Sequence, residues 1–401
     1  MLFNFPLSSP QNRGLLSFTY LFYFAQIGVF VSYVSVFLDD KGFTSQQIGT
    51  LFAIVAVARI IGPNLWAGVA DRTGKVGLVM RIGSLLSLST FLFIFIAESY
   101  LLIVLIFSVM MMFWTAIIPQ LEVTAVNACG TSKGGYGAIR MWGSIGFILA
   151  TIIVGALLDV FSSQAVIISA SFTLFGIFIC TLLITAPKKA NAIHHEGGSI
   201  LPEVLTKGFI AFIVANTLLQ VSFGSFYSFF TLYMRQLDYQ GWQTGIFMAV
   251  GVVAEIIIFV FAARLIKRFS VSGLFVFSLA MTAVRWLMLA FLAHSWWFIL
   301  LSQLMHAFSF GLTHSVSIHY LHKRFSERYH SRAQAIYVSI CFGLGTAIGS
   351  YFAGIWWSDG IGAVSSYVYC ALIAIVATFA ALFITDDKTL KHDEKVSLKE
   401  V

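Results

Sequence analysis

Several ionisable residues interrupt stretches that are otherwise apolar. Arg59, Arg140 and Arg285 each fall inside such a stretch, and so do Glu122 and Glu255. An apolar run of about 20 residues is long enough to cross a lipid bilayer as a helix. A charge inside the bilayer is costly unless it is paired or hydrated. We therefore expect each of these side chains to have a partner, a function or both.

Glu122 and Arg140 are predicted near the adjacent ends of neighbouring spans, close enough to pair. Glu122 lies about one turn before the end of its span, and Arg140 lies about one turn into the next. One interpretation is a pair that opens to receive a substrate carboxylate or a proton. The other is a fixed salt bridge that joins two helices.

Glu255 lies deep in its span, where burial favours the neutral carboxylic acid unless an arginine is close. A carboxyl group that can be neutral or charged is what a proton-coupled carrier requires. Arg285 is the predicted partner of Glu255, and Arg59 is expected to face it from the first half of the chain. A permanent structural network of the same residues is the alternative.

His306 is a further candidate for proton handling, because imidazole titrates near neutral pH. It shares a predicted helix face with His314, eight residues further on. Each could relay a proton or simply be hydrogen-bonded in the helix. The HExxH pattern of zinc enzymes does not occur, and the four cysteines have no paired spacing. We therefore predict no metal site, no cofactor and no enzyme activity.

The composition predicts that these residues belong to a membrane protein. Of the 401 residues, 59% are hydrophobic and only 10% are charged, whereas a soluble domain carries about 25% charged residues. A soluble fold of this size could not hide so much apolar surface from water. The net charge of +7 lies in short loops between apolar runs, which indicates membrane orientation and not nucleic-acid binding.

Twelve transmembrane helices are predicted, in two sets of six. The first set lies near 15–38, 46–69, 78–97, 101–125, 137–158 and 165–186. The second set lies near 208–234, 243–263, 272–293, 296–321, 334–357 and 364–385. The predicted domains are an N-terminal bundle at 1–186, a polar cytoplasmic linker at 187–207, a C-terminal bundle at 208–386 and a cytoplasmic tail at 387–401.

Positive charges set the predicted orientation in the membrane. If both termini lie on one side, nineteen of the 24 lysines and arginines fall on that side, and only Lys41 and Arg235 fall on the other. Cytoplasmic loops are rich in lysine and arginine. Both termini are therefore predicted to be cytoplasmic.

The two halves of the chain form an internal repeat. At an offset of 196 residues they align without a gap from about residue 28 to 105, with Gly28, Gln47, Gly49 and Arg72 matching Gly224, Gln243, Gly245 and Arg268. Parallel repeats of six helices are the architecture of major facilitator transporters, which bind substrate between the halves near the bilayer midplane. The predicted fold is all-α, with 12 transmembrane helices in two pseudo-symmetric bundles.

The loop after the second predicted span resembles the loop motif of the major facilitator superfamily, GxxxDRxGR/K. The predicted gating-loop residues are Asp71, Arg72, Gly74 and Lys75, while Ala67 replaces the first glycine of the motif. Gly74 permits a tight turn, and Asp71 could complement the N-terminus of a neighbouring helix. Such a latch would stabilise one gating state.

Four segments, in the right order, are similar to the 3-phenylpropionate transporter family. They begin at Tyr136, Val253, Val284 and His306 and read YGAIRMWGSIGF, VAEIIIF, VRW and HAFSFGLTH. The resemblance covers nearly the whole chain. It implies proton-linked uptake of phenylpropionate-like aromatic acids across a bacterial inner membrane.

A more distant resemblance is to lactose permease. Glu122 and Arg140 are similar to the pair that holds sugar in that family. Two departures argue against a sugar substrate. Phe147 replaces the sugar-stacking tryptophan, and Ser309 replaces the proton-carrying glutamate.

Together these features predict a monomeric proton symporter for a small aromatic carboxylate. The predicted substrate-binding residues are Arg140, Glu122, Arg285, Trp114, Trp142, Phe147 and Tyr227. The predicted proton-coupling residues are Glu255, His306, Glu122 and Arg59. Arg140 is the first choice for the substrate carboxylate and Arg285 the second. The alternatives are a carrier for a sugar, nucleoside or drug, in either direction, and a sensor that has lost transport.

Overall fold

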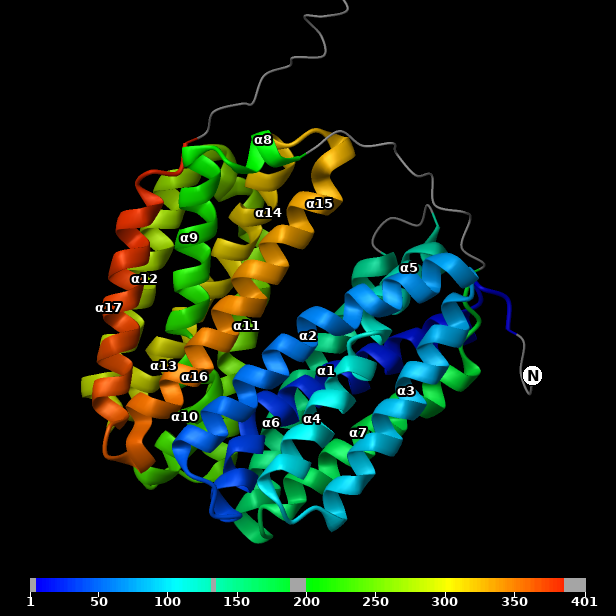
Figure 1. The fold of residues 1–401 in the computed structure, drawn as a ribbon, viewed down its shortest axis with the longest axis horizontal. Coiled ribbons are helices and arrows are strands. Elements are labelled where there is room, and N and C mark those ends of the chain that lie inside the picture. The colour runs from blue at the N-terminus through cyan, green and yellow to red at the C-terminus, as the bar shows by residue number, and fades with distance from the viewer. Residues whose placement is uncertain (1–4, 131–134, 188–199, 386–401) are drawn as a thin grey trace, which may run out of the picture. The chain divides into compact units, whose positions relative to one another are not determined.

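A computed structural model of the chain describes residues 5–130, 135–187 and 200–385 (Figure 1). Over these residues the regular structure is helical, and eleven segments are long and apolar enough to cross a membrane. Most of the predicted linker, at 188–199, and the predicted tail lie outside the described residues. The chain is thus an all-α, multi-pass membrane protein.

The helices follow the predicted spans closely. Those of the first half are α1 (Pro10–Asp40), α2 (Ser45–Thr73), α3 (Val76–Leu92), η1 (Phe93–Ile96), α4 (Tyr100–Trp114), α5 (Ile117–Cys129), α6 (Gly135–Val160) and α7 (Gln164–Leu183). The next are α8 (Leu201–Val204), α9 (Lys207–Ser222), α10 (Gly224–Gln236), α11 (Gly241–Arg268), α12 (Val271–Leu292) and α13 (Trp296–Leu304). The last are η2 (Ala307–Leu312), α14 (Thr313–Arg324), η3 (Glu327–Tyr329), α15 (His330–Tyr337), η4 (Val338–Gly345), α16 (Thr346–Trp357), η5 (Ser358–Gly360) and α17 (Ala363–Ala381).

Several predicted spans are interrupted, including those at 208–234 and 334–357, and two of the other breaks have a local explanation. The span predicted at 101–125 breaks between α4 and α5, where Pro119 lacks the N–H that would bond back to Thr115. The hydroxyl and the backbone N–H of Thr115 both donate to the Met111 carbonyl, at 2.9 Å and 3.0 Å. The span predicted at 296–321 is divided into α13, a π-helix at η2 and α14, so no single helix there reaches the length of a span. Cys129, which lies beyond the span predicted at 101–125, is the buried last residue of α5.

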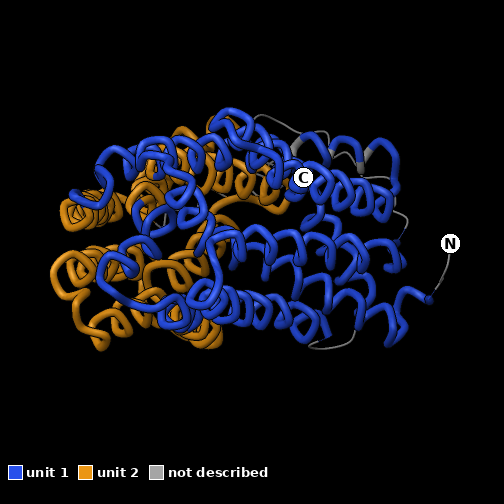
Figure 2. The backbone as a smooth tube through the Cα atoms, turned by 90° about the horizontal axis from the view of Figure 1, so that it is seen from below, with its two compact units in different colours: residues 1–193, 225–249, 350–362 blue, residues 194–224, 250–349, 363–401 orange. Residues whose placement is uncertain are grey.

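The helices form two compact units, which Figure 2 colours separately. Unit 1 contains residues 1–193, 225–249 and 350–362. Unit 2 contains residues 194–224, 250–349 and 363–401. In unit 1, α1 packs along α6 and α7, and in unit 2, α17 packs along α9 and α12.

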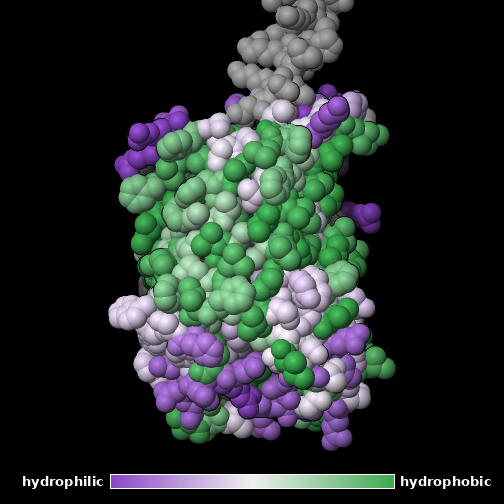
Figure 3. All heavy atoms as spheres, turned by 90° about the vertical axis from the view of Figure 1, so that its left-hand side faces the viewer, coloured by the Kyte–Doolittle hydropathy of each residue, from purple (hydrophilic) through white to green (hydrophobic). Residues whose placement is uncertain are grey.

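The outer faces of the helices are strongly apolar. On the face seen in Figure 3, apolar side chains form a broad region with hydrophilic side chains at both ends, most of them at the lower end. Exposed large apolar residues on α12 and α17 include Phe291, at 61% exposure, and Phe379, at 62%. Surfaces of this kind fit a lipid bilayer, whose core accepts apolar side chains that face outward.

The internal repeat has a structural explanation at the start of two helices in unit 1. The side chain of Gln47 accepts a hydrogen bond from the Thr44 backbone N–H at 3.0 Å. Its repeat partner Gln243 accepts from the Gln240 N–H at 2.8 Å. Each glutamine therefore reaches back over the first turn of its helix, as in a capping box.

A carboxylate from a distant segment caps each of the same two helix starts. Asp359 Oδ1 accepts from the Ser45 N–H at 2.7 Å and from its hydroxyl at 2.5 Å, at the first residue of α2. Asp159 accepts from the N–H groups of Gly241 and Trp242, at 2.6 Å and 2.9 Å, at the start of α11. Negative charge is favourable at a helix N-terminus. We call Asp159 and Asp359 the paired caps.

Close packing of α1 on α6 depends on Gly146. A Cβ added at Gly146 would collide with the backbone of Leu21 in α1. We expect Gly146→Ala to force the two helices apart and to destabilise the protein by about 1–3 kcal/mol, the usual cost of overpacking. The measurement is the thermal unfolding of purified protein in detergent, which should shift to lower temperature.

The matched control for this substitution is Gly137→Ala in the same helix. Gly137 is exposed, and a Cβ added there would meet nothing within 4 Å, so alanine should be tolerated. Alanine is also the better helix former, by about 1 kcal/mol. Equal unfolding temperatures for the two variants would contradict the packing argument.

Candidate functional site

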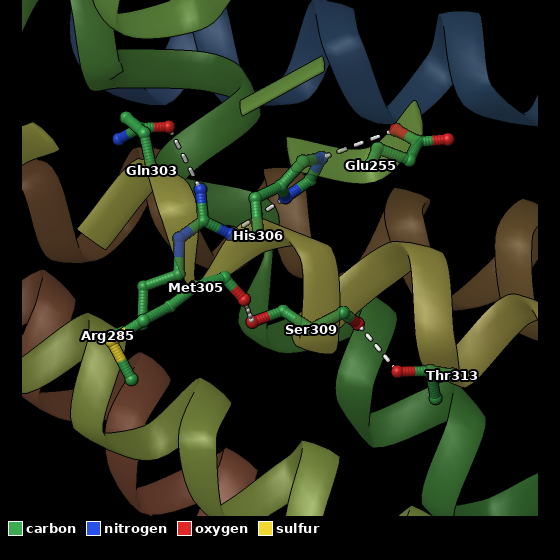
Figure 4. A network of polar contacts seen from close by, with 7 residues as sticks. All are labelled: Glu255, Arg285, Gln303, Met305, His306, Ser309 and Thr313. Carbon is green, nitrogen blue, oxygen red and sulfur yellow. Dashed lines mark hydrogen bonds and ion pairs between the residues drawn. The ribbon is translucent and has the colours of Figure 1, made fainter. Parts of the chain in front are cut away.

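The most deeply buried charge among the described residues lies in unit 2. Arg285, on α12, is 0% exposed. Its Nη1 lies 3.0 Å from His306 Nδ1, and its Nη2 donates to Gln303 Oε1 at 3.3 Å (Figure 4). The guanidinium carbon also lies 4.6 Å from the ring centroid of Trp286. Such partners offset the cost of burying a charge.

The contact with Arg285 fixes the protonation of His306. Guanidinium nitrogens donate hydrogen bonds and do not accept them, so His306 Nδ1 must be the acceptor. A histidine that accepts at Nδ1 is neutral and carries its proton on Nε2. His306 is 9% exposed, which also disfavours a second positive charge beside Arg285.

Glu255, on α11, lies on the other side of the His306 ring (Figure 4). Its Oε2 is 3.9 Å from His306 Nε2, beyond hydrogen-bonding distance. The Glu255 side chain is 20% exposed. Gly311 allows α11 to approach, because a Cβ there would lie 2.4 Å from the Ile258 Cγ2 and 3.2 Å from the Glu255 Cγ. Arg285, His306 and Glu255 thus form a row, which we call the buried charge row.

The π-helix η2 positions His306 at the break in its span. A π-turn leaves backbone groups out of α-helical register and is frequent at functional sites. Hydroxyl groups add bonds to backbone carbonyls here. Ser309 donates to the Met305 carbonyl at 3.1 Å, and Thr313 donates to the Ser309 carbonyl at 2.9 Å (Figure 4). Ser309 therefore has a structural role at the position where it departs from the lactose permease pattern.

Glu122 and Arg140 come together in unit 1, as predicted. Arg140 Nε lies 3.8 Å from Glu122 Oε1, and the two side chains are 36% and 34% exposed. The hydroxyl of Tyr136 donates to Glu122, and the Arg140 guanidinium lies 4.0 Å from the centroid of the Phe24 ring. Arg140 is therefore already engaged by a carboxylate and an aromatic face. A half-exposed pair of this kind contributes only about 1 kcal/mol or less to stability.

Arg59 lies at a cavity inside unit 1. It stands midway along α2 and is exposed. The cavity encloses about 300 Å³ of empty space, part of it open to solvent, and its lining includes Gln26, Phe30, Arg59, Met110, Met111 and Trp114. The indole of Trp114 stacks on the ring of Tyr23, with centroids 4.2 Å apart. The predicted approach of Arg59 to Glu255 would join the two units and stays a prediction.

The remaining predicted aromatic residues lie elsewhere. Trp142 is 38% exposed and packs against Phe18, with ring centroids 6.1 Å apart. Phe147 and Tyr227 are both partly buried. None of these three lines the cavity at Arg59. Trp114 is the predicted aromatic residue that does.

The predicted gating loop is shorter than expected. Helix α2 continues to Thr73, so Arg72 lies in its last turn and not in a loop. The turn itself is made by Gly74, whose φ of +63° suits glycine, and by Lys75. The side chain of Asp71 lies outside the described part of the structure.

Two buried glutamines at these sites were not predicted from the sequence. Gln303 holds Arg285, and Gln26 lines the cavity, with exposures of 1% and 2%. Both lie in apolar spans, where an uncharged polar side chain also needs hydrogen-bond partners. A search for amides as well as charges in the predicted spans would have found them.

Together, the spans, the repeat and the buried charges define a membrane transporter. The chain belongs to the MFS_1 like family, whose profile matches residues 14–369. It is a secondary transporter of the major facilitator superfamily.

Individual relatives support the same class. The chain is 26% identical over 349 residues to the probable 3-phenylpropionic acid transporter of Escherichia coli (strain K12), covering 86% of this chain and 91% of that protein. It is 28% identical over 392 residues to the maltose permease of Geobacillus stearothermophilus, covering 94% and 95%. Its fold is similar to that of the nucleoside transporter NupG, with a TM-score of 0.77, 16% identity, and coverage of 93% of this chain and 98% of the other. These relatives are named for chemically different cargoes.

Proposed function

We propose that this protein takes up a small aromatic carboxylate, such as 3-phenylpropionate, together with a proton. In this proposal it acts as a monomer in a bacterial inner membrane, with both termini in the cytoplasm. The observation that carries the proposal is the buried charge row of Arg285, His306 and Glu255.

Within this row, Glu255 is the group suited to carry the proton. Arg285 keeps its charge at any physiological pH, and its contact keeps His306 neutral. The Glu255 carboxyl is partly buried and lies beyond hydrogen-bonding distance of His306 Nε2. Its protonation is therefore free to change without breaking the Arg285–His306 contact. In this proposal His306 is a positioning residue between Arg285 and Glu255.

Charge balance explains why a proton should accompany the cargo. Moving a net charge through a medium of low dielectric constant is costly. A monocarboxylate and one proton together add no net charge to the carrier. In the proposed cycle, Glu255 gains its proton on the side where substrate enters and releases it on the other side. Only the fully loaded or the fully empty carrier then changes conformation.

Gradient-driven uptake tests the proposal directly. Purified protein in liposomes with an inward proton gradient should accumulate radiolabelled 3-phenylpropionate above its external concentration, and a protonophore should abolish the accumulation. Accumulation that is unaffected by the proton gradient would contradict the proposal.

Competition distinguishes the alternative cargoes. The relatives include a maltose permease and a putative nucleoside transporter of Escherichia coli, so excess maltose and excess uridine are the relevant competitors. We expect benzoate and cinnamate to inhibit uptake and the two neutral compounds to have no effect. Inhibition by maltose or uridine alone would assign the carrier to a different cargo.

A further inference from the structure

We infer that the cavity at Arg59 is the binding site for the substrate, and that Arg59, Gln26 and Trp114 together recognise its carboxylate. This inference rests on the proposed function and adds to it the place and the chemistry of recognition. It also gives Arg59 a role in substrate binding in place of the predicted role in proton coupling.

Arg59 differs from the other arginines inside the spans. Arg140 is engaged by Glu122, and Arg285 by His306 and Gln303. Among the described residues, none forms an ion pair or a hydrogen bond with Arg59. Arg59 nevertheless lies midway along its helix, where a cation needs an anion or water. The cavity beside it supplies the space for an anion.

Two further donors line the same cavity. The Nε2 group of Gln26 and the indole Nε1–H of Trp114 are buried, and neither has a hydrogen-bond partner in the described structure. A buried donor without a partner is unfavourable, because it has lost its hydrogen bonds to water. A ligand group that only accepts hydrogen bonds would satisfy the donors of Arg59, Gln26 and Trp114 together. An ionised carboxylate is such a group.

The side chains that line the cavity offer a ligand almost no hydrogen-bond acceptor. The carbonyl oxygen of Gln26 already accepts the hydroxyl of Thr173. The other lining side chains are apolar or sulfur-containing, among them Phe30, Met110 and Met111. A sugar or nucleoside carries many hydroxyl donors, which would lose their hydrogen bonds to water here. Sites discriminate strongly against ligands that leave buried polar groups unpaired.

The apolar lining suits the remainder of an aromatic acid. Phe30 and the two methionines surround the cavity with aromatic and thioether groups, and sulfur–aromatic contacts are favourable. Stacking on Tyr23 and the Thr173–Gln26 hydrogen bond hold the recognition groups in place.

Binding to detergent-solubilised full-length protein tests the inference without requiring transport. Isothermal titration with 3-phenylpropionate, benzoate and the neutral analogue 3-phenylpropanamide should show binding of a carboxylate and none of the amide. Arg59→Gln should weaken carboxylate binding at least about thirtyfold, the usual effect of removing one member of a charge pair. Trp114→Phe keeps an aromatic ring but removes the N–H, and should weaken binding by roughly tenfold.

Arg235→Gln is the matched control, because it removes an arginine of the same unit that lies outside the cavity and pairs with Asp40 at 2.7 Å. We expect it to bind the carboxylates as the unaltered protein does. The unfolding temperature of each variant shows whether it is folded. Unchanged binding by Arg59→Gln, lost binding by Arg235→Gln, or no carboxylate binding by the unaltered protein would each overturn the inference. Normal carboxylate binding without proton-driven uptake would instead overturn the proposed function and leave the inference standing.

Discussion

Replacing Glu255 by glutamine is expected to abolish proton-driven accumulation while exchange of substrate across the membrane continues. Glutamine has the shape of the protonated, neutral carboxyl group, so the variant should behave as a carrier that is permanently loaded with its proton. Such a carrier can still move substrate in both directions but cannot return empty. The accumulation ratio should fall to about one, and counterflow of labelled substrate should stay within about threefold of the unaltered protein because the barrier for the loaded form changes little.

Proteoliposomes provide both measurements on the same preparation. The matched control is Glu98→Gln, which neutralises an exposed carboxylate between η1 and α4 and should leave accumulation in place. Accumulation that persists in Glu255→Gln would remove Glu255 from the coupling mechanism. Loss of both accumulation and counterflow would indicate a structural role for the carboxylate.

Removing the paired caps is expected to open one end of unit 1. Asp159 and Asp359 join segments that are far apart in sequence, at the starts of α11 and α2. Each cap should contribute about 1 kcal/mol, and more where the acceptor is charged. Asp159→Ala is suitable for the first cap. Asp359 has φ of +52°, so glycine is the substitution that avoids backbone strain.

A buried reporter makes this opening measurable. Ser32 is 2% exposed, and its backbone carbonyl accepts a hydrogen bond from the hydroxyl of Thr231 on α10. A Ser32→Cys reporter should react with a maleimide in detergent at least about tenfold faster once both caps are removed, since about 1.4 kcal/mol corresponds to a factor of ten. The four native cysteines are buried, and protein without the reporter gives their background rate.

Asp238→Gly is the control for the change of backbone. Asp238 has φ of +61°, close to that of Asp359, but its side chain forms none of the capping bonds. This variant should leave the labelling rate unchanged. Equal labelling rates with and without the paired caps would show that they do not hold this end of unit 1 closed.

Much of the architecture could be predicted because it depends on local sequence. The spans follow from apolar runs of sufficient length, and the pairing of Glu122 with Arg140 follows from their positions near adjacent helix ends. The breaks were missed because they depend on finer features. Pro119 removes one backbone donor, and the π-helix after His306 changes the register of a helix that remains apolar throughout.

A membrane transporter with repeated halves can be recognised from the sequence, because hydropathy, charge placement and the 196-residue offset are properties of the chain in one dimension. The charges inside the predicted spans can be identified in the same way. The surroundings of each charge depend on the three-dimensional fold: Arg285 contacts His306, Arg140 contacts Glu122, and Arg59 lies at a cavity. These contacts could not be predicted because pairing depends on helix rotation and on distances between residues far apart in sequence. For the same reason, the hydrogen bond between Asp359 and Ser45, which are 314 positions apart in sequence, could not be predicted.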